Sequence, residues 1–381
     1  MWPELIAAAG RVANSKPEAK ARQMRKEYLE SSLPVDELWP NLYIAPVKGL
    51  AMLRNKQADQ PIDWKEVIVD YGLFGGRAHG QPAKLATIPS FNGQIVSMEY
   101  GYGMHGNPIA EGFHMRSYAH NVVVVDGKDQ FAASGAVPVG KLRGSYSGPE
   151  IQWIDTESTK IYANIYMRRT VFTTDFGIVD LYLCRSDQTH RYDWMFHSFG
   201  IAKSTGCQPV AKLADTGPLA FAVNPQWRTV NQTIKVTWEN TPISQPPTKG
   251  STALLDEKAF VRVWGLPAQD TTISLFGIPM IENVGSEIDY MMLSRTDSTT
   301  VFATVQEAWR ESTDSPIAAV KRLPVLSNGN PVADNQAYAL EIKRHNGEQT
   351  IFFVNYTPTA KTIDTMTSAD DVAVWNVRQN N

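Results

Sequence analysis

Histidine is the side chain best suited to proton transfer near neutral pH, and the seven histidines of this chain are unevenly placed. Four of them fall between positions 79 and 120, namely His79, His105, His114 and His120. The same region is rich in glycine, including Gly75-Gly76 and Gly101–Gly103. A single histidine is more often a packed or surface residue than a catalyst. Their clustering among loops on a sheet nevertheless favours a functional role.

Arg77 and His79 follow the glycine pair on a turn, and Glu99 lies after the next strand pair. Such a loop can present a cation and an imidazole to a ligand. The alternative interpretation is a glycine-rich hairpin corner. Farther along, His120-Asn121 stands at the head of a strand that ends in the turn Asp126-Gly127.

These segments together resemble the C-terminal β-sandwich of the heparinase II/III-like polysaccharide lyases. In that family a glycine-rich loop holds His-Gly-His-x-Asp-Lys-Leu, an acidic residue follows, and a later strand opens with His-Asn and ends in Val-Asp-Gly. The matching residues are His79-Gly80-Gln81-Pro82-Ala83-Lys84-Leu85, Glu99, His120-Asn121, Val125-Asp126-Gly127 and Gln130. A later family stretch is matched by Arg169–Val171, Val179-Asp180, His190, Tyr192-Asp193 and His197. The ordered resemblance covers roughly residues 65–200.

The resemblance implies β-elimination on a uronic-acid polysaccharide such as alginate or a glycosaminoglycan. The enzyme must neutralise the uronate carboxylate, remove the C5 proton and protonate the departing O4. In the family, a Tyr and a His transfer the protons, and most of these groups come from an (α/α) toroid that precedes the sandwich. The sandwich contributes the first His of the motif, which matches His79. Arg77, Tyr102 and Tyr118 are predicted to contact the substrate from the sandwich side.

The resemblance also implies a structural divalent metal, zinc in the family, at positions matched by Gln81, Glu99 and His120. An amide is a poor zinc ligand beside imidazole, so Gln81 departs from the family pattern, as does Ala83 at the usual Asp. Two alternatives stay open. One is a metal-free hydrogen-bond cluster of the same three residues, and the other is a harder, oxygen-preferring ion.

Other polar and aromatic residues have structural roles as their default interpretation. His190 and His197 are an odd number of residues apart, so they lie on opposite faces of one strand and cannot form a ligand pair. Arg168 and Arg169 are expected to be solvated or paired across strands. Three tryptophans are expected in the core rather than as sugar platforms: Trp227, Trp238 and Trp264.

The elements that must position these groups are mainly strands. Residues 1–60 carry a helical pattern, with a capping box at Ser15 and Glu18, and resemble the tail of a toroid. Alternating segments rich in Val, Ile, Tyr, Phe and Thr then predict a large antiparallel β-sandwich over 61–325. The break at Ser327–Asn335 leaves a small C-terminal β domain over 326–381. Helical crossovers are missing between the predicted strands, which favours antiparallel pairing.

The composition sets wider limits. With 381 residues, 43% of them apolar and 20% charged, the chain is neither disordered nor a disulfide-stapled miniprotein. A net charge of −3 gives no argument for nucleic acid or an anionic membrane as partner. Cys184 and Cys207 are expected to be free thiols. The N-terminal residues lack a signal-peptide pattern, whereas the resemblance implies a secreted or periplasmic protein.

The predicted toroid needs some 300 residues by family resemblance, and only about 55 helical residues precede the sandwich. The chain is therefore expected to be a C-terminal piece, a processed half or a binding derivative of a lyase, with an (α/α) toroid and an acidic polysaccharide as partners. Two other functions stay open at this stage. They are a non-catalytic carbohydrate-binding sandwich and a hydrolase that uses carboxylate pairs.

Overall fold

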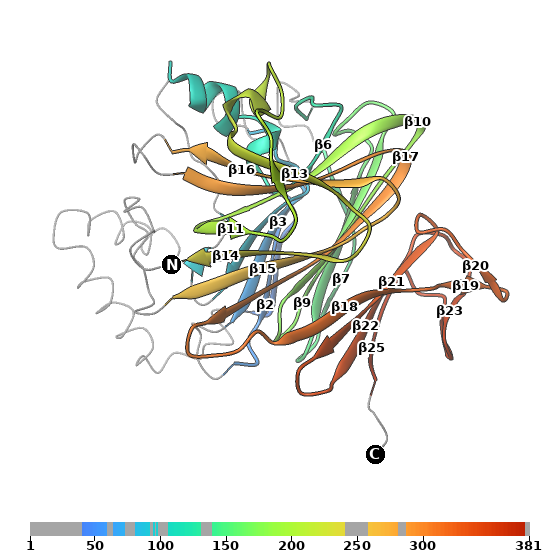
Figure 1. Ribbon diagram of the computed structural model, residues 1–381. Coiled ribbons are helices and arrows are strands. Elements are labelled where there is room, and N and C mark those ends of the chain that lie inside the picture. Colours follow the sequence, from blue (N-terminus) through green and yellow to red (C-terminus); the bar gives the residue numbers. More distant parts are fainter. Residues whose placement is uncertain are drawn as a thin grey trace.

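A computed structural model describes residues 40–58, 64–72, 81–91, 94–95, 97, 106–130, 139–240, 258–280 and 287–377. In these ranges the chain is mainly β, as predicted, and every strand pair is antiparallel (Figure 1). The first sheet runs in the order β1-β2-β3-β4-β5. Its strands are β1 (Leu42–Ala45), β2 (Leu50–Asn55), β3 (Lys65–Asp70), β4 (Ala86–Phe91) and β5 (Gln94–Ile95).

The helical segment predicted over 1–60 is wrong where it can be compared. β1 and β2 form a hairpin through the turn at 46–49, with Leu42 opposite Leu53. The two prolines that break this stretch, Pro40 and Pro46, lie outside the strands. Residues 1–39, which hold the predicted capping box, lie outside the described residues.

A twelve-stranded central sheet forms the middle of the molecule. Its strands are β6 (Val123–Val125), β7 (Lys141–Ser147), β8 (Gln152–Ser158), β9 (Tyr166–Thr173), β10 (Ile178–Ser198), β11 (Ile201–Lys203), β12 (Gln208–Pro209), β13 (Val223–Val230), β14 (Ile234–Asn240), β15 (Ala259–Leu266), β16 (Thr271–Pro279) and β17 (Glu287–Arg310). Three short helical turns accompany it: η3 (Ala110–His114), η4 (Ser117–Ala119) and η5 (Pro218–Phe221).

β10 and β17 are 21 and 24 residues long and pair along most of their length. The sequence pattern predicts the β10 region as two strands, Ile178–Cys184 and Tyr192–Phe199, with a polar break between them. The break is an exposed stretch of the same strand, beside a register shift between Arg185 and His190. The run Ile178–Cys184 is buried on both faces, because sheets cover it from both sides.

The C-terminal region contributes two four-stranded sheets. One consists of β18 (Ile317–Leu323), β21 (Ala337–Arg344), β22 (Gln349–Asn355) and β25 (Val372–Val377). The other consists of β19 (Leu326–Ser327), β20 (Asn330–Pro331), β23 (Lys361–Ile363) and β24 (Met366–Ser368). Since β18 pairs with β21, this unit begins near Ile317 rather than at 326.

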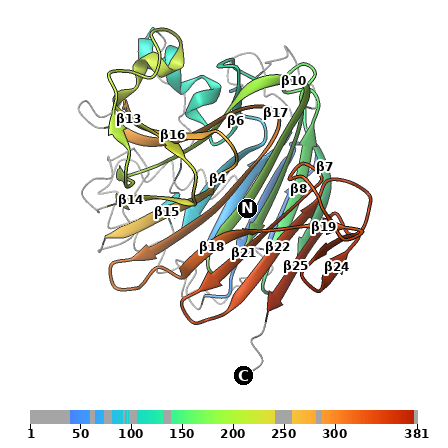
Figure 2. The ribbon, with the colours of Figure 1, turned by 45° about the vertical axis from the view of Figure 1, so that its right-hand side comes forward.

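The sheets lie in layers (Figure 2), and clusters of apolar side chains lie between them. The β1–β5 sheet packs on one face of the central sheet through residues such as Leu53, Val69 and Trp194. The opposite face packs on the β18-β21-β22-β25 sheet through Leu181, Phe172 and Phe352, among others. The smaller C-terminal sheet covers the far side of that sheet, where Phe353 and Ile363 lie in one cluster.

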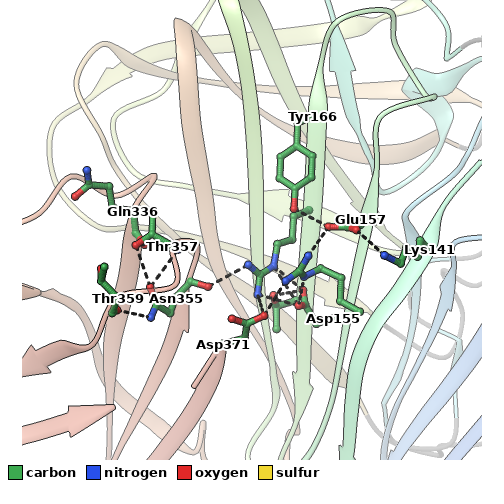
Figure 3. A network of polar contacts seen from close by, with 12 residues as sticks. Lys141, Asp155, Glu157, Tyr166, Gln336, Asn355, Thr357, Thr359 and Asp371 are labelled. Atoms are coloured by element: carbon green, nitrogen blue, oxygen red, sulfur yellow. Dashed lines mark hydrogen bonds and ion pairs between the residues drawn. The ribbon is translucent and has the colours of Figure 1, made fainter. Parts of the chain in front are cut away.

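An ionic network also ties the C-terminal unit to the central sheet (Figure 3). Arg168 of β9 is almost fully buried, binds Asp155 of β8 with an N–O distance of 2.8 Å, and donates to the Asn355 carbonyl at 3.0 Å. Arg143 of β7 bridges Asp155, Glu157 and Asp371, the last of which immediately precedes β25. Of the two states expected for Arg168, the paired state is therefore confirmed and the solvated state is wrong.

Replacing Phe352 with Ala should destabilise the protein by about 3–5 kcal/mol, because it removes a fully buried ring between two layers. The Phe352 ring lies 5.2 Å from Phe172 and 6.3 Å from Phe176. Chemical denaturation measures the change. Tyr43→Ala, at an exposed site, should shift stability by no more than about 0.5 kcal/mol. A Phe352→Ala loss as small as that of Tyr43→Ala would show that the layers do not depend on this contact.

Candidate functional site

Lys84 and Leu85, the last residues of the His79-to-Leu85 motif, close the base of the predicted functional loop. Lys84 Nζ lies 2.6 Å from Asp70 Oδ2, and the Leu85 amide donates to the Asp70 carbonyl at 2.6 Å. Leu85 adopts φ of 59°, a left-handed conformation that costs a side chain of this size about 1–2 kcal/mol. The ends of the segment that contains Arg77 and His79 are thus joined at the edge of β3 and β4.

Gln130 fixes this base to the second motif segment. Its side-chain amide pairs with the Lys84 backbone in both directions, accepting from the amide at 2.6 Å and donating to the carbonyl at 2.9 Å. Ser117 completes the joint, because its hydroxyl donates to the Pro82 carbonyl and accepts from the Gln130 amide, both at 2.8 Å. Two segments far apart in the sequence are therefore held side by side.

Beneath both segments lies the pair of Arg169 on β9 and Asp180 on β10, both with zero solvent exposure. Arg169 Nε donates to Asp180 Oδ1 at 2.9 Å, and one terminal nitrogen donates to Oδ2 at 2.6 Å. The remaining donors reach three groups outside the central strands, the carbonyls of Leu85 and Asn121 and the hydroxyl of Thr87. All five N–H groups of a guanidinium are thereby used. The solvated state expected for Arg169 is wrong, and the paired state is confirmed.

Asn121 continues this buried network. Its amide nitrogen donates to the Thr87 carbonyl at 2.9 Å and to the Ser97 hydroxyl at 2.5 Å, and its amide oxygen accepts from the His197 backbone at 3.2 Å. The His-Asn strand opening is therefore a junction between β4, β6 and β10. We refer to Arg169, Asp180, Asn121 and Thr87 as the polar clamp.

Three histidines are buried close to the polar clamp. His120 has no solvent exposure, His197 stacks on Tyr290 with ring centroids 4.8 Å apart, and His114 ends η3. Burial lowers the pKa of His114 to about 4. A hydrogen bond to the Pro279 backbone opposes that shift, and the nearby His120 adds to it. His114 is therefore neutral near pH 7 and suits hydrogen bonding rather than anion attraction.

Only part of the predicted metal set can be located. Gln81 is half-buried at the start of the motif segment and His120 lies in the interior, while Glu99 is outside the described residues. In the described ranges, no three His, Cys, Asp or Glu side chains lie close enough to hold a metal ion together. His120 is the one good zinc donor of the set found there, so the metal stays a prediction.

The other predicted site residues divide into two groups. His79, Arg77 and Tyr102 lie outside the described residues. Tyr118 is 2% exposed, and its hydroxyl donates to Asp193 Oδ2 at 2.7 Å. Burial and the adjacent carboxylate raise the pKa of Tyr118 well above its usual range. The predicted substrate contact of Tyr118 is therefore wrong, since its hydroxyl is used inside the protein.

The remaining predictions for polar and aromatic residues are confirmed in part. His190 and His197 do occupy different environments: His190 binds Asp126 at 2.8 Å near the surface, and His197 is interior. Trp238 and Trp264 are buried as expected, whereas Trp227 is 42% exposed, so its predicted core role is wrong. Both cysteines are free, with Cys184 buried and Cys207 half-buried.

Sequence reasoning did not identify Asp70, Ser117 or Thr87 as site supports. Asp70 ends an alternating strand, where an acidic residue usually means only a solvated position. Ser117 acts through the Pro82 carbonyl, 35 positions away, and Thr87 through the Arg169 side chain, 82 positions away. A usable signal existed only for Arg169 and Asp180, which are charged residues inside otherwise apolar strands.

The sequence and the fold both match known proteins. The family model "Heparinase II/III-like, C-terminal" matches residues 43–241, just over half of the chain. Among solved structures, heparan sulfate lyase HepC from Pedobacter heparinus is similar with a TM-score of 0.58 and 9% identity, covering 88% of this chain and 47% of that one. The structure titled "Heparinase III-BT4657 gene product" is similar with a TM-score of 0.57 and 15% identity, covering 93% of this chain and 48% of that one. "Heparinase III" is similar with a TM-score of 0.55 and 16% identity, covering 82% of this chain and 42% of that one. A comparison with curated proteins found no match.

The antiparallel β-sandwich is similar in fold to part of the heparinase III and HepC structures. The chain is a member of the heparinase II/III-like family, because its residues 43–241 match the C-terminal domain of that family. It spans less than half the length of the solved structures named above. No helix in the described ranges has both the length and the apolar character needed to cross a bilayer.

Asp180→Asn should destabilise the protein by roughly 3–5 kcal/mol, because it leaves the Arg169 charge buried without its counter-charge. Urea denaturation gives the value. Asp215→Asn is the matched control, since Asp215 and its partner Lys212 are both mostly exposed, and it should change stability by at most about 0.5 kcal/mol. Equal effects of the two substitutions would refute a special role for the buried pair.

Acid should destabilise the fold through His114. Its folded pKa of about 4 lies below the ordinary value of 6.5, so the unfolded state binds a proton that the folded state does not. Above pH 6.5 this group does not lower the free energy of unfolding. That free energy falls by on the order of 3 kcal/mol as the pH drops toward 4. His114→Gln should flatten the pH dependence of the urea midpoint over this window. The exposed His345→Gln variant should not, and an unchanged slope in His114→Gln would contradict the assignment.

Proposed function

We propose that this chain is the sandwich part of a polysaccharide lyase that cleaves a uronic-acid polysaccharide, such as a glycosaminoglycan or alginate, by β-elimination. Family membership over residues 43–241 supports the lyase class. The observation that carries the site assignment is the closure of the 71–84 segment by Asp70, Lys84 and Leu85 above the polar clamp. This arrangement joins Asp70 and Lys84, which flank the segment that contains His79, at the edge of rigid strands, as the support of a catalytic group requires.

The chemistry divides between two partners. Elimination breaks the C5–H bond and the C4–O4 bond and forms a C4–C5 double bond. A base takes the C5 proton, and an acid gives a proton to O4. In this proposal His79 faces the uronate from the sandwich side. There it either hydrogen-bonds the carboxylate, which makes the C5 proton more acidic, or exchanges one of the two protons. Arg77 and Tyr102 are proposed to bind the sugar beside it.

The second partner is an (α/α) toroid that supplies the Tyr. Its presence is a proposal, supported by the fact that the chain covers only 42–48% of the solved heparinase III and HepC structures. A native mass measurement of the purified protein tests whether a helical chain accompanies it. The structural metal is tested in the same sample. Stoichiometric zinc that disappears in His120→Ala would support the metal site, and a metal-free protein would support the metal-free hydrogen-bond cluster.

The lyase proposal predicts that the enzyme assembled from this chain and its (α/α) toroid produces absorbance near 232 nm, from the unsaturated product, on at least one of heparan sulfate, hyaluronan, alginate and ulvan. His79→Ala should lower the initial rate by at least about 100-fold, the usual contribution of a positioned proton-transfer group. His345→Ala is the matched control, on the exposed β21–β22 turn, and should keep the full rate.

Two results would reject the proposal in favour of the other functions. Retention on a polysaccharide affinity gel without any 232 nm product would indicate a non-catalytic binding sandwich. New reducing ends without that absorbance would indicate a hydrolase.

A further inference from the structure

A groove of about 780 Å³ lies where the C-terminal unit meets one end of the central sheet. Glu150 and Ile151, in the β7–β8 turn, form one wall, and the Thr174–Phe176 turn before β10 forms another. The β21–β22 turn and the end of β25 complete it. None of the four polar-clamp residues lines this groove. The groove is therefore distinct from the polar clamp.

The groove walls carry hydroxyl, amide and carboxylate groups whose positions are fixed by mutual hydrogen bonds. Asn376 donates to Glu150 Oε2 at 3.0 Å, and Thr350 donates to Asn376 Oδ1 at 3.0 Å. Arg344 donates to Asp175 at 2.9 Å and lies 5.0 Å from the centre of the Phe176 ring. A rigid array of alternating donors and acceptors suits a ligand that has many hydroxyl groups.

The charges of the walls disfavour an anionic ligand. Glu150, Asp175 and Glu348 line the groove, and among the residues that the structure describes Arg344 is the one cation that lines it. That guanidinium is already shared between Asp175 and Glu348. A uronate or sulfate would meet an excess of negative charge without a free counter-ion, whereas an uncharged sugar would not.

An aromatic pair, half-buried Trp153 and exposed Tyr146, continues the groove along β8. Trp153 follows Ile151 by two residues, on the same strand face, and both pack against the same apolar cluster. Tyr146, directly opposite on β7, stacks on Trp153 with ring centroids 6.4 Å apart and 20° between the planes. Tyr146 is 51% exposed on an otherwise polar edge strand. Two sheet residues span roughly 7 Å, so the pair stands about one sugar ring from the groove wall.

Polar side chains border this aromatic pair. Arg143 of β7 donates to Asp371, which immediately precedes β25, at 2.7 Å, so β7 and the start of β25 are adjacent. Aromatic faces that pack on the C–H face of a pyranose, beside fixed polar groups for its hydroxyls, form a surface suited to a sugar.

We infer that the groove and the Tyr146–Trp153 pair together form a binding site for a neutral, hydroxyl-rich oligosaccharide. The site is separate from the proposed lyase centre and does not depend on that function. It would hold an uncharged stretch of glycan on the C-terminal side of the sandwich.

The test is a titration of the whole chain with cellotetraose, maltotetraose and mannotetraose, followed by calorimetry and by saturation-transfer NMR. At least one neutral tetrasaccharide should bind with a millimolar or lower Kd. Trigalacturonate, as the anionic comparator, should bind at least about tenfold more weakly. Tyr146→Ala should weaken the binding about five- to tenfold, the value of one lost stacking contact. Tyr43→Ala, the matched control on the β1–β2 hairpin at 56% exposure, should leave it unchanged.

A second pair of variants tests the groove itself. Asn376→Ala removes the amide between Glu150 and Thr350 and should also weaken binding, whereas Asn330→Ala, at the exposed start of β20 in the same C-terminal unit, should not. His79→Ala should not change the titration, which separates this site from the lyase centre. No binding of any neutral tetrasaccharide, equal losses in variants and controls, or preference for trigalacturonate would each overturn the inference.

Discussion

The buried pair of Arg169 and Asp180 is the interaction on which the candidate site depends. A charge pair at zero exposure is stable only when its hydrogen bonds are complete, and here each guanidinium N–H has an acceptor. Two of those acceptors are carbonyls of irregular backbone, at Leu85 and Asn121, which no strand ladder satisfies. The pair therefore connects the central sheet to the backbone at Leu85 and Asn121, just before β4 and β6.

The layered architecture explains why such a charged group can be buried at all. β9 and β10 lie between two apolar clusters, so side chains on both of their faces are removed from water. On one face the buried polar groups form the polar clamp. On the other face Arg168 and Asp155 form a second network, which reaches Asn355 and Asp371 of the C-terminal unit. Adjacent arginines in one strand thus point to opposite faces and join the central sheet to different neighbours.

The sequence predicted the mainly β, antiparallel fold and most of the long strands, because alternation of Val, Ile, Tyr and Phe reports directly on burial. It predicted β10 as two strands, since an exposed stretch within a strand cannot be told from a loop by composition. It also predicted helix where β1 and β2 form a hairpin, because the prolines there interrupt any regular pattern. For the site, the motif residues Lys84, Gln130 and Asn121 were placed by resemblance. Their roles depend on partners 14 to 46 positions away, which no local pattern contains.

Most motif residues located in the structure hold other residues rather than face a ligand. Lys84 binds Asp70, Gln130 binds the Lys84 backbone, Asp193 accepts from Tyr118, and Asp180 binds Arg169. An apolar replacement of Arg169 would fill its volume but leave the carbonyls of Leu85 and Asn121 buried without donors, a cost of about 1–3 kcal/mol for each. A lysine would supply one charge but not the planar set of donors that reaches five acceptors from a single point. The motif residues described here thus serve first to hold the scaffold together. A loop that carries a histidine can be held in one place above the sheet only where this scaffold is complete.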